Sequence, residues 1–421
     1  KTYNGKNRTF FFASYEGLRL IQPVILTGVR VPSIAARENA TGAVKSLLEA
    51  YPLPNAPAFA DAPAETPYNA GFSNPSTLNA TSIRIDHSLS SRFSIFGRYN
   101  YAPSQTRQRA RYSAASFVAI LPNDTQTATA GSTMMFTPAV NNDLRFNWSQ
   151  SRASQDYVQD TFGGAKLLSN DILFPSFAPQ GESLYYLTIG GNDENTLSPG
   201  TFSRNTQRQI NIVDTASWSL GSHSFKFGFD YRLLTPSIGG RTYSKVLTVP
   251  TITQLATGIV PSAEIRQTAG YLEPRYHNFS AFAQDAWKMT SRFTLTYGLR
   301  WEVNPSPGGV DIFTVQGMDN FSTAKPAPKG SKLYNTTFKN FAPRVGIAYQ
   351  PFTNHGTVIR AGFGMFYDLG YAFTGTALSP SFYPFSRTTL LSDIPIQDPR
   401  LFGEAGPLNP NPPYSRLFAY D

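Results

Sequence analysis

The residues that could perform acid–base or metal chemistry are few and scattered. Four histidines, His87, His223, His277 and His355, lie far apart, and none has a second histidine or a carboxylate at the spacing used by metal sites. Asp86 and His87 are only neighbours in sequence, and in a strand their side chains would point to opposite faces. We therefore interpret the histidines as surface residues and predict no metal site.

Nucleophilic and phosphate-binding motifs are also missing from the sequence. The chain has no cysteine, which excludes thiolate chemistry and disulfide scaffolds. Gly362 and Gly364 have the first spacing of a dinucleotide fingerprint, but Tyr367 occupies the third glycine position and no βαβ pattern surrounds it. No nucleophile elbow, P-loop or zinc-protease motif occurs. We expect no catalytic activity and no cofactor.

The composition favours a β-structure with one face in lipid. Of 421 residues, 14% are aromatic and only 15% charged, against roughly 25% charged in ordinary soluble domains. The net charge of +9 is scattered, with no run of five basic residues, so nucleic acid is not a predicted partner. The charge fits solvated loops and lumen walls, or an electropositive lumen suited to anionic ligands. No apolar stretch approaches the roughly 18 residues of a transmembrane helix.

Several segments alternate apolar or aromatic residues with polar or small ones, the pattern of a strand with two unlike faces. The clearest is 293–302, where Leu295, Tyr297, Leu299 and Trp301 share one face. Similar alternation marks the segments 94–101, 143–149, 225–232 and 359–367. Their length is close to the 9–11 or so residues that cross a bilayer at a tilt.

Each alternating segment is preceded by a short turn and a partner strand. The turns fall at 88–91, 137–141, 220–223, 288–291 and 351–355. Between the hairpins lie long polar stretches at 19–82, 102–126, 150–208, 235–277 and 303–341. Short turns at one end and long loops at the other are typical of outer-membrane β-barrels. The sequence therefore predicts an all-β, antiparallel transmembrane barrel with short periplasmic turns and long extracellular loops.

The strand count predicts an incomplete barrel. An opening strand near 9–17 and five hairpins give about eleven strands, whereas single-chain bacterial barrels have an even number. The chain starts at Lys1 with no signal peptide, and it ends within a further predicted outer loop, 369–421. We expect residues 1–421 to be one partial barrel domain that belongs to a longer protein.

The alternation also assigns individual side chains to the two faces. Five charged residues fall on the predicted lumen face and are candidate ligand contacts: Arg98, Arg145, Asp230, Arg300 and Arg360. They could instead form ion pairs that stabilise the wall. The four tryptophans, Trp148, Trp218, Trp287 and Trp301, are candidates for the aromatic girdles at the two membrane interfaces. Packing in the core of a β-sandwich is the alternative for them.

Specific segments resemble the barrel of TonB-dependent receptors of the Oar-like type. NRTFFFASYEGLR at 7–19 is similar to the first barrel strand that follows the plug, and RIDH at 84–87 with FGRY at 96–99 to the next hairpin. FAQDAWK at 282–288, followed by LTYGLRWE at 295–302, resembles the most recognisable barrel motif. The segments 340–349 and 358–368 match as well. The matches occur in order over most of the chain.

The resemblance implies a barrel of about 22 strands with a plugged lumen, energised by the TonB complex through an N-terminal region absent from this sequence. The plug, the N-terminal domain of the Oar-like group and the second half of the barrel would be missing too. Outer-membrane lipid, the TonB complex and an unidentified solute are then the expected partners, and the outer membrane of a Gram-negative-type bacterium is the expected location.

Three functions remain open at this point. The first is a receptor that imports a solute with TonB-derived energy. The second is a surface adhesion or interaction protein that uses the long outer loops. The third is a soluble extracellular glycan-binding β-protein. Tyr, Asn, Ser and Pro in the loops suit sugars, peptides and siderophores alike, so the sequence does not select the solute.

Overall fold

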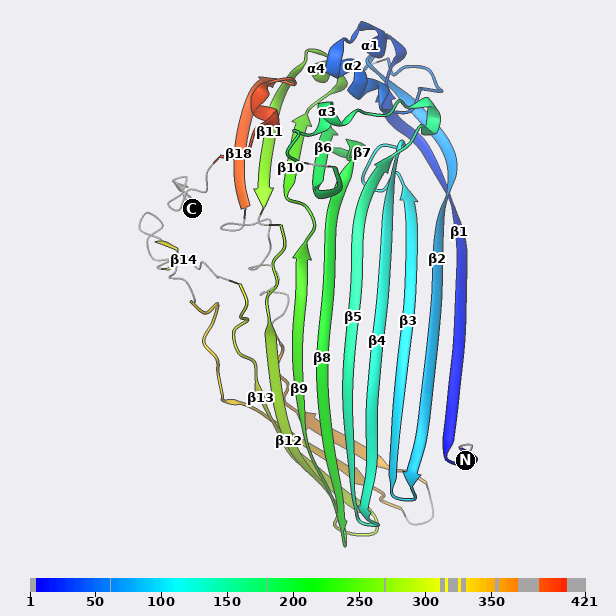
Figure 1. Ribbon diagram of the computed structural model, residues 1–421, viewed down its shortest axis with the longest axis vertical. Helices are drawn as coiled ribbons and strands as arrows, with labels where there is room; N and C mark the ends of the chain where they lie inside the picture. Colours follow the sequence, from blue (N-terminus) through cyan, green and yellow to red (C-terminus); the bar gives the residue numbers. More distant parts are fainter. Residues whose placement is uncertain are drawn as a thin grey trace.

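A computed structural model describes residues 5–60, 62–178, 180–268, 270–310, 315–316, 325–326, 331–352, 356–369 and 386–406. Long antiparallel strands form a curved sheet, and short helices lie at one end of it (Figure 1). His355 lies outside the described residues, as does part of each stretch expected as a loop at 303–341 and 369–421.

Eleven strands pair one after another along the main path of this sheet, which we call the wall. They are β1 (Thr9–Pro32), β2 (Glu65–Ser90), β3 (Phe93–Arg109), β4 (Phe117–Thr137), β5 (Val140–Gln159), β8 (Gly200–Leu220), β9 (His223–Gly239), β12 (Tyr276–Lys288), β13 (Phe293–Val303), β16 (Asn340–Tyr349) and β17 (Ile359–Gly364). Every neighbouring pair is antiparallel. The predicted fold class is confirmed, and the described part of the wall contains the expected eleven strands.

The strands are joined at one end by short turns. Leu220 pairs with His223 across a two-residue turn, in which Gly221 has φ of +57°. Tight hairpin turns need a positive φ to match the right-handed twist of the strands, and glycine adopts it without steric penalty. A side chain at position 221 would therefore strain this turn, whatever space surrounds it.

The wall strands are much longer than predicted. β2 has 26 residues, about 85 Å at 3.3 Å per residue, whereas the hydrocarbon core of a bilayer is about 30 Å thick. The expected loops at 19–82, 102–126 and 150–208 are therefore partly strand: β1 continues to Pro32 and β3 to Arg109. In these extensions the two faces are alike, because β1 carries apolar residues on both, such as Leu20 and Ile21, and β3 carries polar residues on both, so the alternation that marks a strand with one apolar face is lost.

A second set of elements, which we call the cap, lies beyond the long-strand end of the wall (Figure 1). Five short strands lie side by side in the order β7 (Asn192–Leu197), β6 (Ser183–Ile189), β10 (Tyr243–Val249), β11 (Ile259–Thr268) and β18 (Ser386–Pro395). β6 and β10 are parallel, and the other pairs are antiparallel. β6 touches the wall at the bridge between Leu184 and Gly200.

Short helices complete the cap. They are α1 (Ile34–Asn39), α2 (Gly42–Glu49), α3 (Asn170–Leu173) and α4 (Ile252–Ala256), with 3-10 turns η1 (Phe162–Gly164), η2 (Gln180–Glu182) and η3 (Pro399–Phe402). Two helices begin at N-caps whose side chains accept a backbone N–H, Ser33 from Ala36 and Thr251 from Gln254. No helix in the described part of the chain is long and apolar enough to cross a membrane.

The main hydrophobic core of the described chain lies in the cap. Leu47 and Leu48 of α2, Leu187 of β6 and Leu247 of β10 are fully buried in one cluster. The cluster also includes Ile394 from β18. Segments that are widely separated in sequence, and that were expected to be separate loops, therefore share one packed interior.

Lys245 places a cationic side chain inside this cap core. It is 1% exposed, and its Nζ donates to the Ile172 carbonyl at 3.2 Å. The ammonium lies 3.8 Å from the centre of the Phe402 ring and 5.3 Å from that of Tyr185. Burial disfavours the charged form and lowers the pKa of Lys245 to about 7.

Candidate functional site

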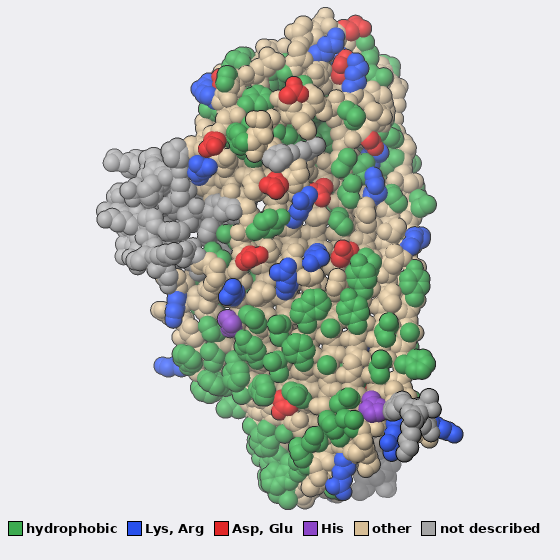
Figure 2. Space-filling view, viewed as in Figure 1, with side chains coloured by type: hydrophobic (Ala, Val, Ile, Leu, Met, Phe, Trp, Pro, Cys, Tyr) green, Lys and Arg blue, Asp and Glu red, His purple; other side chains and the backbone are tan. Residues whose placement is uncertain are grey.

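The two faces of the wall differ sharply in chemistry. The face toward the viewer in Figure 2 carries a broad apolar band over the lower half of the molecule, with charged residues above it. Phe146 and Phe227 are exposed side chains of this face. The strand register places the exposed side chains of Tyr297, Val345 and Phe363 on the same face of the strands that follow. Directly paired residues of antiparallel strands share a face, so the strand register assigns every other wall residue to one face or the other. We call the face with the band the outward face and the other the lumen face.

The four tryptophans lie on the outward face, the face on which a membrane girdle would have to lie. Trp218 pairs with Phe225, Trp301 with Phe341 and Trp148 with Ile210, and all these partners are apolar residues of the outward face. Trp287 stacks on His223 with ring centres 5.2 Å apart. The alternative, burial of these side chains in a sandwich core, does not describe them.

Their spacing along the strands matches the height of a membrane band. Trp218 and Ile210, the partner of Trp148, are eight residues apart on β8. Eight residues span about 27 Å along a strand, or roughly 20 Å across the membrane at a tilt near 40°. The apolar band of outer-membrane barrels is about 25 Å tall. The separation of Trp218 and Trp148 along the strands is therefore close to the height of such a band, and their place in its aromatic girdles stays a prediction.

The lumen face carries the five charged residues selected from sequence. Arg98 donates to Ser82 Oγ at 3.2 Å and to Asn100 Oδ1 at 3.0 Å. Arg145 pairs with Gly131, and Arg360 pairs with Ala348. Both partners are small residues of the lumen face. Asp230 and Arg300 come from β9 and β13, and only these two of the five line the cavity described next.

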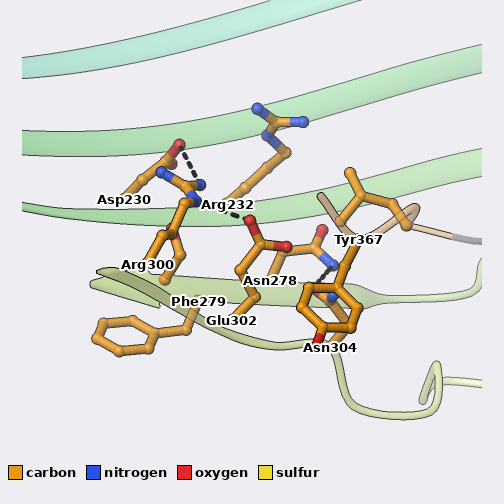
Figure 3. A pocket seen from close by; sticks show the side chains of 10 residues that line it. Asp230, Arg232, Asn278, Phe279, Arg300, Glu302, Asn304 and Tyr367 are labelled. Atoms are coloured by element: carbon orange, nitrogen blue, oxygen red, sulfur yellow. Dashed lines mark hydrogen bonds and ion pairs between the residues drawn. The ribbon is translucent and has the colours of Figure 1, made fainter. Parts of the chain in front are cut away.

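Asp230 and Arg300 meet in a small cavity on the lumen face, of about 170 Å³. Figure 3 shows Asp230, Arg300 and Glu302 meeting there from β9 and β13, with Asn278, Asn304 and Tyr367 beside them, whereas the ring of Phe279 points away. The lining residues are Asp230, Arg232, Asn278, Phe279, Ser280, Arg300, Glu302, Asn304, Tyr367 and Leu369. Segments as far apart in sequence as Asp230 and Leu369 thus contribute to one polar site.

Arg300 lies between two carboxylates in this cavity. Its Nε donates to Glu302 Oε1 at 2.7 Å, and its Nη2 lies 3.8 Å from Asp230 Oδ2. Asp230 also accepts from Asn211 Nδ2 at 2.6 Å. These contacts hold the Arg300 guanidinium in place and compensate its charge, so Arg300 acts first as part of the wall.

Arg232 is the less engaged cation of the cavity. Its Nε is buried, and among the described residues it has no hydrogen-bond partner. In Figure 3 its guanidinium points away from the ion pairs of Arg300, and no dashed line joins it to Asp230 or Glu302. A buried donor without a partner is costly. The arrangement can therefore accept an anionic or strongly polar group at Arg232.

Sequence reasoning missed Arg232, Glu302, Asn278, Asn304 and Tyr367 as members of this site. Two of them were accessible from the pattern, because Arg232 and Glu302 each lie two residues from a selected residue and so on the same face. Asn278 Nδ2 donates to Asn304 Oδ1 at 2.9 Å. That contact depends on how β12 leads into the segment after β13, which alternation does not specify.

A second polar cluster lies on the outward face, near the short turns. His223 Nδ1 and Asp285 Oδ2 are 2.6 Å apart, and Tyr297 donates to the same carboxylate oxygen at 3.0 Å. The backbone N–H of Ser224 donates to Asp285 Oδ1. Asp285 is nearly fully buried and links β9, β12 and β13. His223 was expected only as a surface residue beside a turn.

No group of three or more potential metal ligands occurs in the described ranges. His87 lies 2.9 Å from the Thr9 hydroxyl, and His277 2.9 Å from the Tyr231 hydroxyl. Hydroxyl partners of this kind are typical of structural histidines.

A family model described as "Outer membrane beta barrel domain" matches residues 39–418. No curated protein sequence matches the chain. Among solved structures, the outer membrane transporter YddB from Escherichia coli is 11% identical, with a TM-score of 0.44 over 85% of this chain and 37% of that one.

Two further solved structures are similar at the same level. The copper transporter OprC is 13% identical with a TM-score of 0.43, over 75% of this chain and 42% of that one. The open form of the ferric-catecholate import receptor Fiu from E. coli K12 is 12% identical with a TM-score of 0.39, over 85% of this chain and 54% of that one. The chain thus spans about half or less of these structures.

Proposed function

The chain belongs to the outer membrane β-barrel domain family, and from this premise we propose that the protein is a receptor that imports a solute with energy from the TonB complex. Its location is the outer membrane of Gram-negative bacteria. The proposal assigns the chain a binding and transport role without catalysis, and a solute rather than a resident cofactor as its ligand.

The lumen cavity carries this proposal. The interior of outer-membrane barrels is polar, and residues that face it tune selectivity, so a cavity on this face that is lined by both signs of charge is a candidate place for a solute. Here Asp230, Arg232, Arg300 and Glu302 surround one cavity above the middle of the apolar band. Arg232, whose buried Nε has no partner among the described residues, is the first candidate for ligand contact.

TonB dependence is supported by the barrel motifs at 282–288 and 295–302, which resemble those of TonB-dependent receptors. The test is uptake of labelled siderophores, oligosaccharides and oligopeptides by cells that produce the complete protein, with and without TonB. We expect uptake of one of these classes, and its loss without TonB. Uptake that persists without TonB would refute energy coupling.

Arg232→Gln connects the uptake to the cavity. We expect it to reduce uptake at least several-fold, because hydrogen bonds to a charged group contribute about 1.5–3 kcal/mol. Lys226→Gln is the matched control, since it removes a lumen-face cation of the same strand that does not line the cavity. Equal uptake by the two variants would show that Arg232 and its cavity have no specific role in transport.

A surface adhesion or interaction protein is the second candidate. The observation that favours it is the cap, whose elements are packed around one core and present a defined surface outside the wall. Binding to cells or matrix that is independent of TonB, and lost when the cap core is disrupted, would support this role over import.

The soluble glycan-binding alternative is set aside. Family membership and the outer-membrane location account for the exposed aromatic face of the wall, which a soluble protein would need to cover.

A further inference from the structure

Arginines lie on the outward face of the wall directly above the apolar band. Figure 2 shows blue side chains immediately above the band, interspersed with red ones. Arg208 on β8 and Arg152 on β5 are both exposed. We call these two side chains the arginine rim. Neither lines the lumen cavity, so the proposed import function leaves them unused.

Three successive cross-strand rows place the rim relative to the apolar residues of the same strands. The first row marks the upper edge of the band and consists of Tyr99, Ala128, Trp148, Ile210 and Leu233. The second row consists of Tyr101, Gln126, Gln150, Arg208 and Thr235. The third consists of Pro103, Asp124, Arg152, Thr206 and Ser237. The outward face thus changes from apolar to hydroxyl, amide and guanidinium within one row.

The second and third rows lie about 7 and 13 Å beyond the first along the strands. At a strand tilt near 40°, these are heights of about 5 and 10 Å. The polar layer outside the hydrocarbon is about 5–8 Å thick on each side. Arg208 therefore lies within this layer, and the long side chain of Arg152 reaches it from above.

Arg208 is held in a fixed direction. Its Nε donates to Gln150 Oε1 at 3.0 Å, and Gln150 is itself buried. This bond leaves the terminal guanidinium nitrogens available to a ligand. Arginine binds phosphate oxygens with two parallel N–H groups, which a flexible lysine does not do.

Carboxylates near the rim do not cancel its charge. Asp124 pairs with Arg152 in the register. Two rows above Arg152, Asp156 Oδ1 lies 3.3 Å from Arg204 Nη2. Arg107 on β3 is exposed on the same face. Four guanidinium groups thus face two carboxylates, and Gln126 and Thr235 lie in the same row as Arg208 as partners for sugar hydroxyls.

We propose that the arginine rim binds the phosphorylated saccharide headgroup of the glycolipid in the outer leaflet. Arg208 and Arg152 contact the phosphates, and Gln126 and Thr235 contact the sugar. The position selects a membrane lipid over a free anion, because the acyl chains of the same molecule would cover the apolar band beneath. This inference is independent of the import function, since it concerns the opposite face of the wall.

The test measures the glycolipid that stays bound to the complete protein, extracted from outer membranes and washed in a non-ionic detergent. Lipid is quantified by mass spectrometry for the wild type and for Arg152→Gln/Arg208→Gln. We expect the double variant to retain roughly tenfold less glycolipid, because charge-assisted contacts are lost. Similar retention by the two proteins would overturn the proposal.

The matched control is Lys226→Gln/Arg344→Gln, which removes two cations from the lumen face. It should retain glycolipid like the wild type, and an equal loss in both double variants would show non-specific charge attraction. All variants must keep the heat-dependent electrophoretic shift of a folded barrel. If the glutamine variant does not fold, Arg152→Lys/Arg208→Lys replaces it, with a several-fold loss expected from the missing two-point geometry.

A second measurement isolates the phosphate. The purified protein, stripped of lipid, is offered the intact glycolipid or the same glycolipid after enzymatic removal of its phosphates. We expect only the intact form to be retained. Equal retention of both forms would contradict the phosphate contact, even if the arginine variants retain less glycolipid than the wild type.

Discussion

The cap buries its apolar side chains inside the protein, whereas the wall exposes them on its outward face. In the cap, Leu187 is 0% exposed and packs against side chains from several segments. In the wall, Leu144 is 42% exposed and faces outward within the aromatic band. The same residue type thus contributes to stability through protein packing in one region and through contact with lipid in the other.

This difference also separates what holds each region together. Wall strands are fixed by continuous antiparallel hydrogen bonding, from β1 through β17 in the described ranges. The cap instead depends on a single apolar cluster assembled from short elements. Damage to the cluster should therefore destabilise the cap and leave the wall intact. A charge introduced on the outward face should destabilise the wall and leave the cap intact.

The largest expected effect comes from a matched pair of truncations. Leu187→Ala should destabilise the cap by about 2–5 kcal/mol, because it leaves a cavity in a closed core. Leu144→Ala should cost the wall under about 1 kcal/mol, because lipid fills the space. Limited proteolysis of the cap and the heat-dependent gel shift of the wall report the two regions. Equal sensitivity of both regions to the two variants would contradict the comparison.

The pH dependence of the cap should follow Lys245. Its pKa is lowered to about 7 in the folded cap, whereas an unfolded lysine titrates near 10.4. Between these values the unfolded chain binds more protons, so the free energy of unfolding rises with pH. We expect a gain of up to about 4 kcal/mol from pH 7 to 10, and no further change below pH 7.

Lys245→Met tests that dependence. It should flatten the pH profile of cap proteolysis in urea, and at pH 7 it should make the cap more resistant than the wild type. The wall has no part in this effect, so its gel shift serves as the internal control. A methionine variant that keeps the wild-type pH profile would assign the dependence to another group.

The outward face can be probed with one substitution at two heights. Ile95→Arg lies within the band on β3, where its paired residues His87 and Ser132 offer no carboxylate, and it should destabilise the wall by about 2–4 kcal/mol. Tyr101→Arg lies six residues higher on the same face of β3, above the band, and should cost about 0–1 kcal/mol. Thermal midpoints of the gel shift in lipid vesicles measure both. Similar midpoints would place the membrane elsewhere on the wall.

The smallest expected effect concerns Asp285, which joins three wall strands near the short turns. Asp285→Asn should lower wall stability by about 1–3 kcal/mol, because its charged hydrogen bonds are lost. Asp143→Asn is the control, since that carboxylate accepts from Thr133 at an exposed site. Cap proteolysis should change in neither variant, and a loosened cap in Asp285→Asn would show that the two regions are coupled.

Much of the wall was predictable from sequence. The alternation in 293–302 placed Arg300 and Trp301 on opposite faces, and the register agrees. The hairpin turn at 220–223 was also visible, from its polar residues and Gly221. Both succeed because a strand with one face in lipid must alternate, and the period of two is a local property of the chain.

The cap and the cavity were harder to predict from the sequence. Nothing local indicates that Leu47, Leu187 and Leu401 share one core, because that contact joins elements more than 100 residues apart. Above the band the two faces of β1, and likewise those of β2, no longer differ in polarity, so the extension of these strands leaves no apolar period of two. The pair of His223 and Asp285 likewise joins residues far apart in the sequence.

The sequence by itself determined that the chain is an all-β wall with one aromatic face, which side chains occupy that face, and where the short turns lie. These properties follow from alternation and turn chemistry, which act over a few residues. Only the tertiary structure decided that the outer segments pack into one cap, that Lys245 is enclosed there, and that Arg232 joins Asp230 and Arg300 in a cavity. Those features depend on long-range packing, where the contact partner is set by the path of the whole chain.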